Sequence, residues 1–343
     1  MRFGIFVPQG WRMDLAGIEA DQHWGVMAGL AERAEMTRLW ESVWVYDHLH
    51  TVPEPSQEAT HEAWTLMAAL AAVTSRIRLG QMCTCMGYRN PAHLAKVAAT
   101  VDIISEGRLE MGIGAGWYEH EWRAYGYGFP SAGDRVGMLE EGVQIFRDMW
   151  TKGSATLNGK HYQVDGAICA PLPLQGTTQP GSALNGIPIW IAGGGEKRTL
   201  RIAAQYADYT NFAPSVFEHK SEILAAHCVD VGRDFTQITR STNVNVVIGE
   251  NEKEVRDRLA WIREHYLKAG VPEADVDRQI EAQTSGVGVG TPEQIAEKLT
   301  ALKKLGLGYT IAYFTEAAYD TSGMHLFENR VIPELREPRR AVL

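Results

Sequence analysis

A histidine and an aspartate stand directly after an apolar run, where catalytic side chains are common. The segment Trp44–Tyr46 is apolar and aromatic, which is typical of a strand, and Asp47 and His48 follow it. A histidine can exchange a proton near neutral pH, and a neighbouring carboxylate can orient or charge it. We therefore predict that His48 moves protons with Asp47 as its partner. The alternative is a histidine that only satisfies a carbonyl of its loop.

The pair His48 and His50 also suggests a metal site. Its spacing is similar to the ligand pair of amidohydrolase barrels, which need further histidines at later strand ends. The later candidate strand ends, Ile191–Gly195 and Asp208–Phe212, contain no histidine. A Cys-x-Cys pair that starts at Cys83 has no other ligand type beside it. These observations argue against a metal-dependent hydrolase.

Three consecutive glycines separate another expected strand from an expected helix. Ala192 is followed by Gly193–Gly195, and Lys197 and Arg198 come soon after. Glycines let the backbone approach a ligand closely, and free N–H groups at a helix start favour an anion. Basic residues in a first turn oppose the helix dipole, and a bound phosphate would explain them. A tight turn without a ligand is the alternative, because the segment matches neither a Walker loop nor the full dinucleotide pattern.

A second glycine-rich strand end is expected at Gly112–Gly116. Its Gly-x-Gly-x-Gly pattern is a weak signal alone, and an aromatic and acidic segment follows from Trp117 to Trp122. Together the two glycine segments would leave a space for a planar ring and a phosphate tail. Glu119 and Glu121 could act as acids or bases, but we interpret them as exposed carboxylates of a helix.

Composition limits the classes to which the chain can belong. Its 343 residues carry a formal net charge of −9, which leaves no basic surplus for a nucleic-acid partner. No run reaches the ~20 apolar residues of a membrane helix, and the first residues lack the pattern of a signal peptide. Four cysteines are too few for a disulfide framework. We expect a cytoplasmic globular protein that acts on a small molecule and binds no membrane.

Expected strands and helices alternate along the chain in the rhythm of βα units. The strands are expected at Phe3–Val7, Ser42–Tyr46, Ile77–Cys83, Leu109–Ile113, Ile187–Ala192, Tyr209–Phe212, Asn243–Ile248 and Tyr309–Phe314. The helices are expected at Trp24–Thr37, Ala63–Ala72, Ala92–Ile104, Asp134–Trp150, Lys197–Ala207, Val216–Val231, Glu252–Lys268, Pro292–Leu305 and Met324–Leu335. Eight alternations predict an α/β fold of the (β/α)8 TIM-barrel type, with an open doubly wound sheet as the alternative.

Two inserts, near residues 154–186 and 270–290, exceed the minimal repeat of what we expect to be a single domain, 1–343. In the first, Asn158-Gly159 predicts a β-hairpin, and a loop rich in Pro, Gln and Gly follows from Pro171 to Gly186. Insertions after barrel strands often shape the active-site mouth. Both inserts are therefore candidate lids at the C-terminal mouth, with plain surface excursions as the alternative.

Taken in order, these motifs resemble those of the bacterial luciferase-like monooxygenase superfamily, most of all the branch that uses the deazaflavin coenzyme F420. The resemblance covers nearly the whole chain. It rests on Asp47-His48, Tyr88-Arg89-Asn90-Pro91, Gly107-Arg108-Leu109, Gly112-Ile113-Gly114-Ala115-Gly116-Trp117, Gly193-Gly194-Gly195-Glu196-Lys197-Arg198-Thr199-Leu200 and Tyr206-Ala207-Asp208. Each motif is modest alone, and their order makes them specific.

The resemblance implies a site as well as a fold. It places a cofactor ring at the C-terminal mouth of the barrel, with His48 beside the reacting ring. It also implies a cis peptide bond at Met82–Cys83 and a phosphate held by the glycine backbone. The cofactor-binding residues that it implies are Asp47, Met82, Cys83, Gly114, Ala115, Gly116, Ala192, Gly193, Gly194 and Gly195. Family members are commonly dimers, so a homodimer is expected.

One departure from the family pattern bears on the substrate. The sugar-phosphate dehydrogenases of this family place a carboxylate where this chain has Trp117. They also hold the substrate phosphate with basic residues at late strand ends, and here Gly249–Asn251 and Thr315–Ala317 carry no positive charge. A sugar phosphate is therefore not expected. We expect a flat, largely apolar substrate in a pocket formed by Trp44, Trp117, Tyr118 and Tyr313.

Three functions are compatible with these residues. The leading hypothesis is hydride transfer between F420 and a small organic substrate, with His48 handling the accompanying proton. The first alternative is an FMN-dependent monooxygenase that receives reduced flavin from a partner reductase. The second alternative is a flavin-binding protein without turnover. F420 and FMN share the ring and phosphate features that these motifs would hold, so the motifs discriminate poorly between them.

Overall fold

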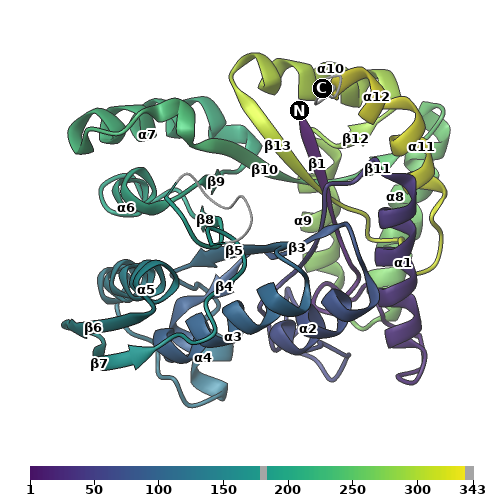
Figure 1. Ribbon diagram of the computed structural model, residues 1–343. Coiled ribbons are helices and arrows are strands. Elements are labelled where there is room, and N and C mark those ends of the chain that lie inside the picture. Colours follow the sequence, from purple (N-terminus) through teal and green to yellow (C-terminus); the bar gives the residue numbers. More distant parts are fainter. Residues whose placement is uncertain (178–183, 337–343) are drawn as a thin grey trace.

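The computed structural model describes residues 1–177 and 184–336, so residues 178–183 of the expected loop Pro171–Gly186 lie outside the described part. The centre of the protein is a closed barrel of eight parallel strands (Figure 1). In barrel order they are β1 (Arg2–Phe6), β2 (Ser42–Val45), β3 (Arg78–Gln81), β5 (Leu109–Gly114), β8 (Ile189–Ala192), β9 (Tyr209–Asn211), β10 (Thr239–Asn245) and β13 (Leu307–Tyr313). A short strand, β4 (Thr84–Cys85), also pairs with β5. The predicted (β/α)8 barrel is confirmed.

Helices surround the barrel between the strands. They are α1 (His23–Thr37), α2 (Ala63–Val73), α3 (Pro91–Ile104), α5 (Ala132–Lys152), α6 (Thr199–Tyr206), α7 (Phe217–Val231), α8 (Glu252–Lys268), α10 (Pro292–Lys304), α11 (Ser322–Arg330) and α12 (Ile332–Leu335). The Asn90 side chain accepts hydrogen bonds from the first turn of α3, and Thr291 and Gln294 form a capping box on α10. Among the described residues, no helix is both long and apolar enough to cross a membrane.

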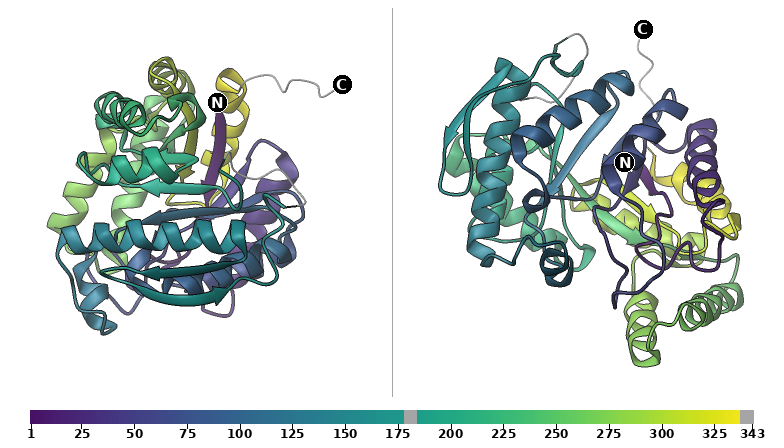
Figure 2. Two further views of the ribbon diagram at one scale, coloured as in Figure 1. Left: turned by 60° about the vertical axis from the view of Figure 1, so that its left-hand side comes forward. Right: turned by 90° about the horizontal axis from the view of Figure 1, so that it is seen from below.

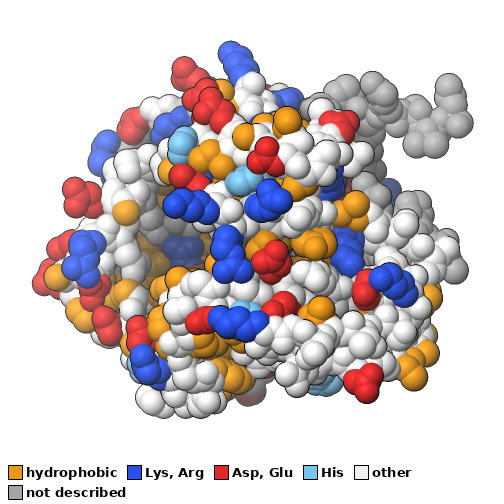
Figure 3. Space-filling model, turned by 90° about the vertical axis from the view of Figure 1, so that its left-hand side faces the viewer, with side chains coloured by type: hydrophobic (Ala, Val, Ile, Leu, Met, Phe, Trp, Pro, Cys, Tyr) orange, Lys and Arg blue, Asp and Glu red, His pale blue; other side chains and the backbone are white. Residues whose placement is uncertain are grey.

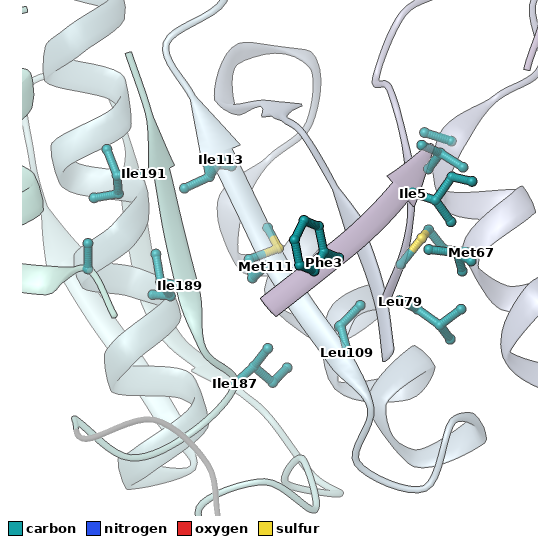
Figure 4. Packing of buried hydrophobic residues seen from close by; sticks show 14 of the residues in the cluster. Phe3, Ile5, Met67, Leu79, Leu109, Met111, Ile113, Ile187, Ile189 and Ile191 are labelled. Carbon is teal, nitrogen blue, oxygen red and sulfur yellow. The ribbon is translucent and has the colours of Figure 1, made fainter. Parts of the chain in front are cut away.

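Alternate residues of each strand face outward and pack under the helices. On β5 the outward residues Leu109, Met111 and Ile113 are fully buried in the main hydrophobic cluster, which Figure 4 shows in part. Ile189 and Ile191 of β8 belong to the same cluster. This period of two follows from the pleat of a strand, and it explains why the strand segments are β-branched and apolar.

The inward residues fill the barrel itself. Trp44 and Trp190 contact each other edge to face, with ring centroids 4.7 Å apart, and neither is exposed. A side chain at Gly4 or Gly80 would collide with the Trp44 ring, so these two glycines make room for it. The barrel axis is therefore closed by aromatic rings below the mouth.

The seventh barrel strand starts earlier than expected. The sequence predicts it at Asn243–Ile248, whereas β10 begins at Thr239. The early part is polar, and Ser241 and Thr242 are nevertheless buried. Their burial costs little because both hydroxyls donate to carbonyls of the neighbouring strand segment. The end of the expected segment forms a separate strand, β11 (Val247–Ile248), which pairs with β12 (Val289–Gly290).

The two inserts have different structures. The first contains the expected hairpin, β6 (Ser154–Asn158) and β7 (Gln163–Ile168), which runs alongside α5 (Figure 2, left). The second contains α9 (Glu273–Thr284), a helix that was not expected from the sequence. Val276 of α9 joins a hydrophobic cluster with residues of α8, and the two helices lie together in Figure 2, right.

Candidate active site

A cavity of about 370 Å³, here called the mouth cavity, lies at the carboxyl ends of the barrel strands. The predicted site residues that line it are Asp47, His48, Met82, Cys83, Gly114, Ala115, Gly116, Trp117, Tyr118, Ala192 and Gly193. Residues that also line it but were not predicted as site residues are Trp11, Tyr46, Cys85, Tyr88, Thr199 and Asn243. Neither insert contributes a described residue to this lining, so their role as lids stays a prediction.

The partner of His48 is a glutamate that was interpreted as exposed. Glu121 lies on α4 (Glu119–Ala124) and is fully buried, with its Oε2 atom 2.9 Å from Nδ1 of His48. The hydroxyl of Tyr88 also donates to Oε2, and the backbone N–H groups of Leu49 and His50 donate to Oε1. The expectation for Glu119 is confirmed, since its side chain is 53% exposed, and the expectation for Glu121 is wrong.

The charge of Glu121 decides which nitrogen of His48 carries a hydrogen. Burial alone would raise the pKa of Glu121, but the hydrogen bond and charge of His48, with the two backbone N–H groups, outweigh burial and lower it. Glu121 is thus ionised at neutral pH and can only accept, so Nδ1 of His48 carries a hydrogen. Nε2 is then the atom of His48 that remains for a ligand.

Asp47 does not orient His48. Its carboxylate accepts two hydrogen bonds from the Arg89 guanidinium, at 2.7 and 2.9 Å, and a third from the backbone N–H of Cys85. Arg89 also pairs with Glu62, which caps α2. Because the bidentate pair holds the end of β2 against the segment after β3, Asp47 is a buried structural anchor at the cavity wall.

Aromatic rings hold the His48 imidazole from several sides. Trp11, from the loop after β1, stacks on it with ring centroids 4.0 Å apart and an interplanar angle of 3°. Trp117 and Tyr118 approach it edge to face at 5.8 and 6.0 Å. Trp117 stacks on Tyr118 and is 61% exposed, so it stands at the rim of the cavity. The imidazole is therefore fixed in orientation before any ligand binds.

Two thiols line the same wall. The peptide bond Met82–Cys83 is cis, as the resemblance implies. Burial and the negative charge of Asp47 raise the pKa of the Cys83 thiol to about 12, and the same causes raise the pKa of Cys85. Both side chains are thus protonated at neutral pH, and they contribute soft apolar surface rather than a nucleophile.

The glycine turn lies at the edge of the mouth cavity, and its cation is different from those expected. Helix α6 begins at Thr199, so Lys197 and Arg198 precede its first turn, and Arg198 pairs with Glu140 of α5. Lys220 of α7 comes closer, because its aliphatic stem lies 3.2 Å from the position of a Cβ on Gly194, and its ammonium group pairs with Glu196. Several Lys and Arg side chains lie across the middle of this side of the molecule (Figure 3).

Two predicted pocket residues lie below the mouth cavity and do not line it. Trp44 points into the barrel because it alternates with the outward residues of β2, and its indole N–H donates to Ser42. Tyr313 is 2% exposed and donates to Asp14, with the Arg12 guanidinium 4.3 Å above its ring. Both contribute to the floor on which the cavity rests.

This geometry can be compared with known proteins. Residues 1–308 match the family model described as luciferase-like monooxygenase. The chain belongs to the luciferase-like monooxygenase family. It is an enzyme of the luciferase-like oxidoreductase type.

Two curated members of the luciferase-like monooxygenase family illustrate how the chain resembles its relatives. It is 34% identical over 221 residues to the pyrimidine monooxygenase RutA of Stutzerimonas stutzeri, which is 62% of this chain and 56% of that protein. It is 29% identical over 290 residues to phthiodiolone/phenolphthiodiolone dimycocerosates ketoreductase of Mycobacterium bovis, which is 76% of this chain and 72% of that protein. The chain thus spans little more than half the length of the first relative.

Solved structures of similar fold cover nearly the whole chain. An F420-dependent secondary alcohol dehydrogenase in complex with an F420-acetone adduct has a TM-score of 0.75 at 21% identity, over 98% of this chain and 99% of that chain. The monooxygenase RslO1 from Streptomyces bottropensis has a TM-score of 0.78 at 22% identity, over 98% and 100%. At these identities the likeness shows the shared luciferase-like fold.

Proposed function

We propose that this enzyme transfers a hydride between coenzyme F420 and a small, largely apolar organic substrate. The observation that carries the proposal is the pair His48 and Glu121, which leaves Nε2 of His48 for a ligand at the wall of the mouth cavity. Hydride transfer to or from a carbonyl or alcohol carbon needs a proton to be moved at the attached oxygen. A fixed imidazole supplies that group.

The residues of the mouth cavity fit a flat ring with an anionic tail. A volume of about 370 Å³ lies in the range of small-molecule sites. Backbone rather than side chains forms the wall at Gly114–Gly116 and Gly193, so a planar group can lie against it. The glycines of the turn Gly193–Gly195 let the backbone approach the phosphate of the tail, and the stem of Lys220, whose ammonium pairs with Glu196, lies beside Gly194.

The side chains of this enzyme then have separate tasks. When bound, F420 supplies or accepts the hydride at its ring. His48 holds or releases a proton at Nε2, and Glu121 keeps the opposite hydrogen on Nδ1. Trp117 and Tyr118 cover the rim and reduce the access of water to the reacting atoms.

The lining also favours a neutral substrate. Among the described lining residues only Asp47 and His48 are ionisable at neutral pH, and Asp47 is already paired with Arg89. Apart from His48, the described lining includes no basic side chain that could pair with a phosphate or carboxylate of the substrate. A ketone or secondary alcohol with an apolar body matches this lining, because Trp11 and Trp117 offer apolar surface and His48 offers one polar contact.

An FMN-dependent monooxygenase is the second candidate function. The family model is described as a monooxygenase, and a relative with 34% identity is a pyrimidine monooxygenase by name. The first candidate, an F420-dependent enzyme, has its own counterpart among proteins of the same fold, the F420-dependent secondary alcohol dehydrogenase. Both cofactors would place a ring and a phosphate in the same cavity, and an FMN enzyme would need a partner reductase.

A binding titration of the full chain with F420 and with FMN tests the choice. We expect F420 to bind saturably, with FMN at least about tenfold weaker, a difference of about 1.4 kcal/mol. The measurement is quenching of ligand fluorescence, repeated by calorimetry. Tight FMN binding without F420 binding would replace the first candidate with the second, and binding of both without turnover would support a flavin-binding protein.

The phosphate site has its own test at Gly194. We expect Gly194→Asp to weaken cofactor binding by about tenfold or more, because a carboxylate there repels a phosphate. Gly194→Asn is the matched control, since it has nearly the same shape without the charge. The affinity of both variants is measured by the same titration. Equal affinities of the Asp and Asn variants would show that no phosphate lies beside this turn.

A further inference from the structure

A second cavity, here called the α8 cavity, lies between α8 and the segment that follows β13. Its volume is about 420 Å³, and it shares no lining residue with the mouth cavity. It is lined by Glu254, Asp257, Arg258 and Trp261 of α8 and by Glu316, Tyr319 and Asp320. Four carboxylates and one guanidinium thus line it; Arg258 pairs with Glu316 and Asp320, and Asp257 pairs with Lys253.

Glu316 is the residue that makes this cavity more than an acidic surface. Glu316 is 3% exposed, and its Oε1 atom lies 3.3 Å from Nη1 of Arg258. Its Oε2 atom is shielded from water and has no hydrogen-bond partner among the described residues. A buried carboxyl oxygen without a donor is costly, so a donor that reached it would be favourable.

Arg258 cannot neutralise this carboxyl alone. The same guanidinium also contacts Asp320 at 3.3 Å and donates to Ser322 at 2.6 Å. Burial raises the pKa of Glu316 to about 7, and Arg258 offsets this only in part while Asp320 adds to it. Arg258 is therefore shared between Glu316 and Asp320, and a cation that entered the cavity would favour the ionised form of Glu316.

The other wall of the α8 cavity is aromatic. The rings of Trp261 and Tyr319 lie 5.5 Å apart with an interplanar angle of 57°, and Tyr319 is 39% exposed. The His265 ring stacks on Trp261 at 5.0 Å and contacts Tyr319 edge to face at 5.0 Å, so the three rings hold one another. An apolar group can pack on this surface, and the ring faces favour a cation.

We infer that the α8 cavity binds a small organic ammonium ion that carries an apolar group. The ammonium pairs with the carboxylates of Glu316 and Asp320, and the apolar group packs against Trp261 and Tyr319. An anion is disfavoured by the carboxylates. A bare divalent metal ion is also disfavoured, because no cluster of three or more ligating side chains with metal-binding geometry occurs within residues 1–177 and 184–336.

The test is a calorimetric titration of the full chain with benzylamine, which is an ammonium ion at pH 7.5. Benzyl alcohol and benzoate are the neutral and anionic probes of the same shape. We expect saturable one-to-one binding of benzylamine only. Binding of benzyl alcohol with equal affinity would show an apolar site without charge recognition, and no binding of benzylamine would remove the inferred site.

Variants locate the site. We expect Glu316→Gln and Asp320→Asn each to weaken benzylamine binding by about tenfold or more, because each removes a charged acceptor. Glu264→Gln is the matched control, since Glu264 lies on α8, is 64% exposed and does not line the cavity. Asp320 is itself 55% exposed, so its variant tests the site even if Glu316→Gln fails to fold. Unchanged affinity in Asp320→Asn would overturn the inference.

Discussion

Replacement of His48 by asparagine is expected to lower turnover by about 10²- to 10⁴-fold, the usual contribution of a positioned proton-transfer group. The asparagine amide nitrogen can occupy the place of Nδ1 and still donate to Glu121. It leaves nothing at the place of Nε2, which is the atom that remains for the substrate. Cofactor affinity should stay near that of the parent enzyme, because Trp11 and the glycine turns are untouched.

A second variant separates proton transfer from hydrogen bonding. His48→Gln places an amide near the position of Nε2 but cannot exchange a proton near neutral pH. Single-turnover rates of the three proteins, with cofactor binding measured in parallel, make the comparison. If the glutamine variant turns over like the parent, His48 only hydrogen-bonds the substrate and its assignment as proton carrier must be dropped.

Replacement of Glu121 by glutamine should be nearly as damaging. The carboxylate accepts from His48, Tyr88 and two backbone N–H groups, whereas an amide presents one donor end that cannot accept. The variant loses the preference for hydrogen on Nδ1, so Nε2 no longer has a defined state. A fall of about 10²- to 10³-fold in turnover is expected, by analogy with other carboxylates that orient a catalytic histidine.

The pH dependence of stability tests whether the Glu121 carboxylate is ionised in the folded enzyme. Because folding lowers the pKa of Glu121, its stabilisation is full above the ordinary value of 4.5 and is lost as the pH falls through the lowered value. The melting temperature of Glu121→Gln should therefore fall short of the parent at pH 7, and the gap should narrow in acid. Glu119→Gln is the control, because Glu119 is exposed on the same helix. It should match the parent enzyme in turnover and in melting temperature at each pH.

Much of the fold could be predicted because the strands carry a strong local signal. Outward positions such as Leu109, Met111 and Ile113 must be apolar, and inward glycines must leave space, so strand positions show in the sequence. The exceptions have physical reasons. The polar side chains of Thr239–Thr242 are more typical of a loop than of a buried strand, so the start of β10 was not predicted. Helix α9 has few apolar residues, since most of its surface is exposed.

The site was harder to predict because its contacts join distant segments. Gly114–Gly116, Gly193 and His48 belong to short sequence motifs and line the cavity as predicted, whereas Gly194 and Gly195 are not among its lining residues. Glu121 was misinterpreted because α4 has six residues, too few for periodicity to show which carboxylate is buried. Trp11 follows β1 without any motif, and Lys220 lies on a different helix from the turn that it approaches. A homodimer and a partner reductase stay predictions.

The aromatic rings that close the barrel axis have a consequence for the order in which ligands bind. Trp44 and Trp190 close the axis below the mouth cavity, so molecules cannot enter or leave through the far end of the barrel. A ring seated against the strand ends and a substrate above it must then share one entrance. In the proposed function the cofactor ring lies deeper than the substrate, so we expect the cofactor to bind first and to leave last. Steady-state kinetics should accordingly be sequential and ordered, with spent and fresh cofactor competing for the same form of the enzyme.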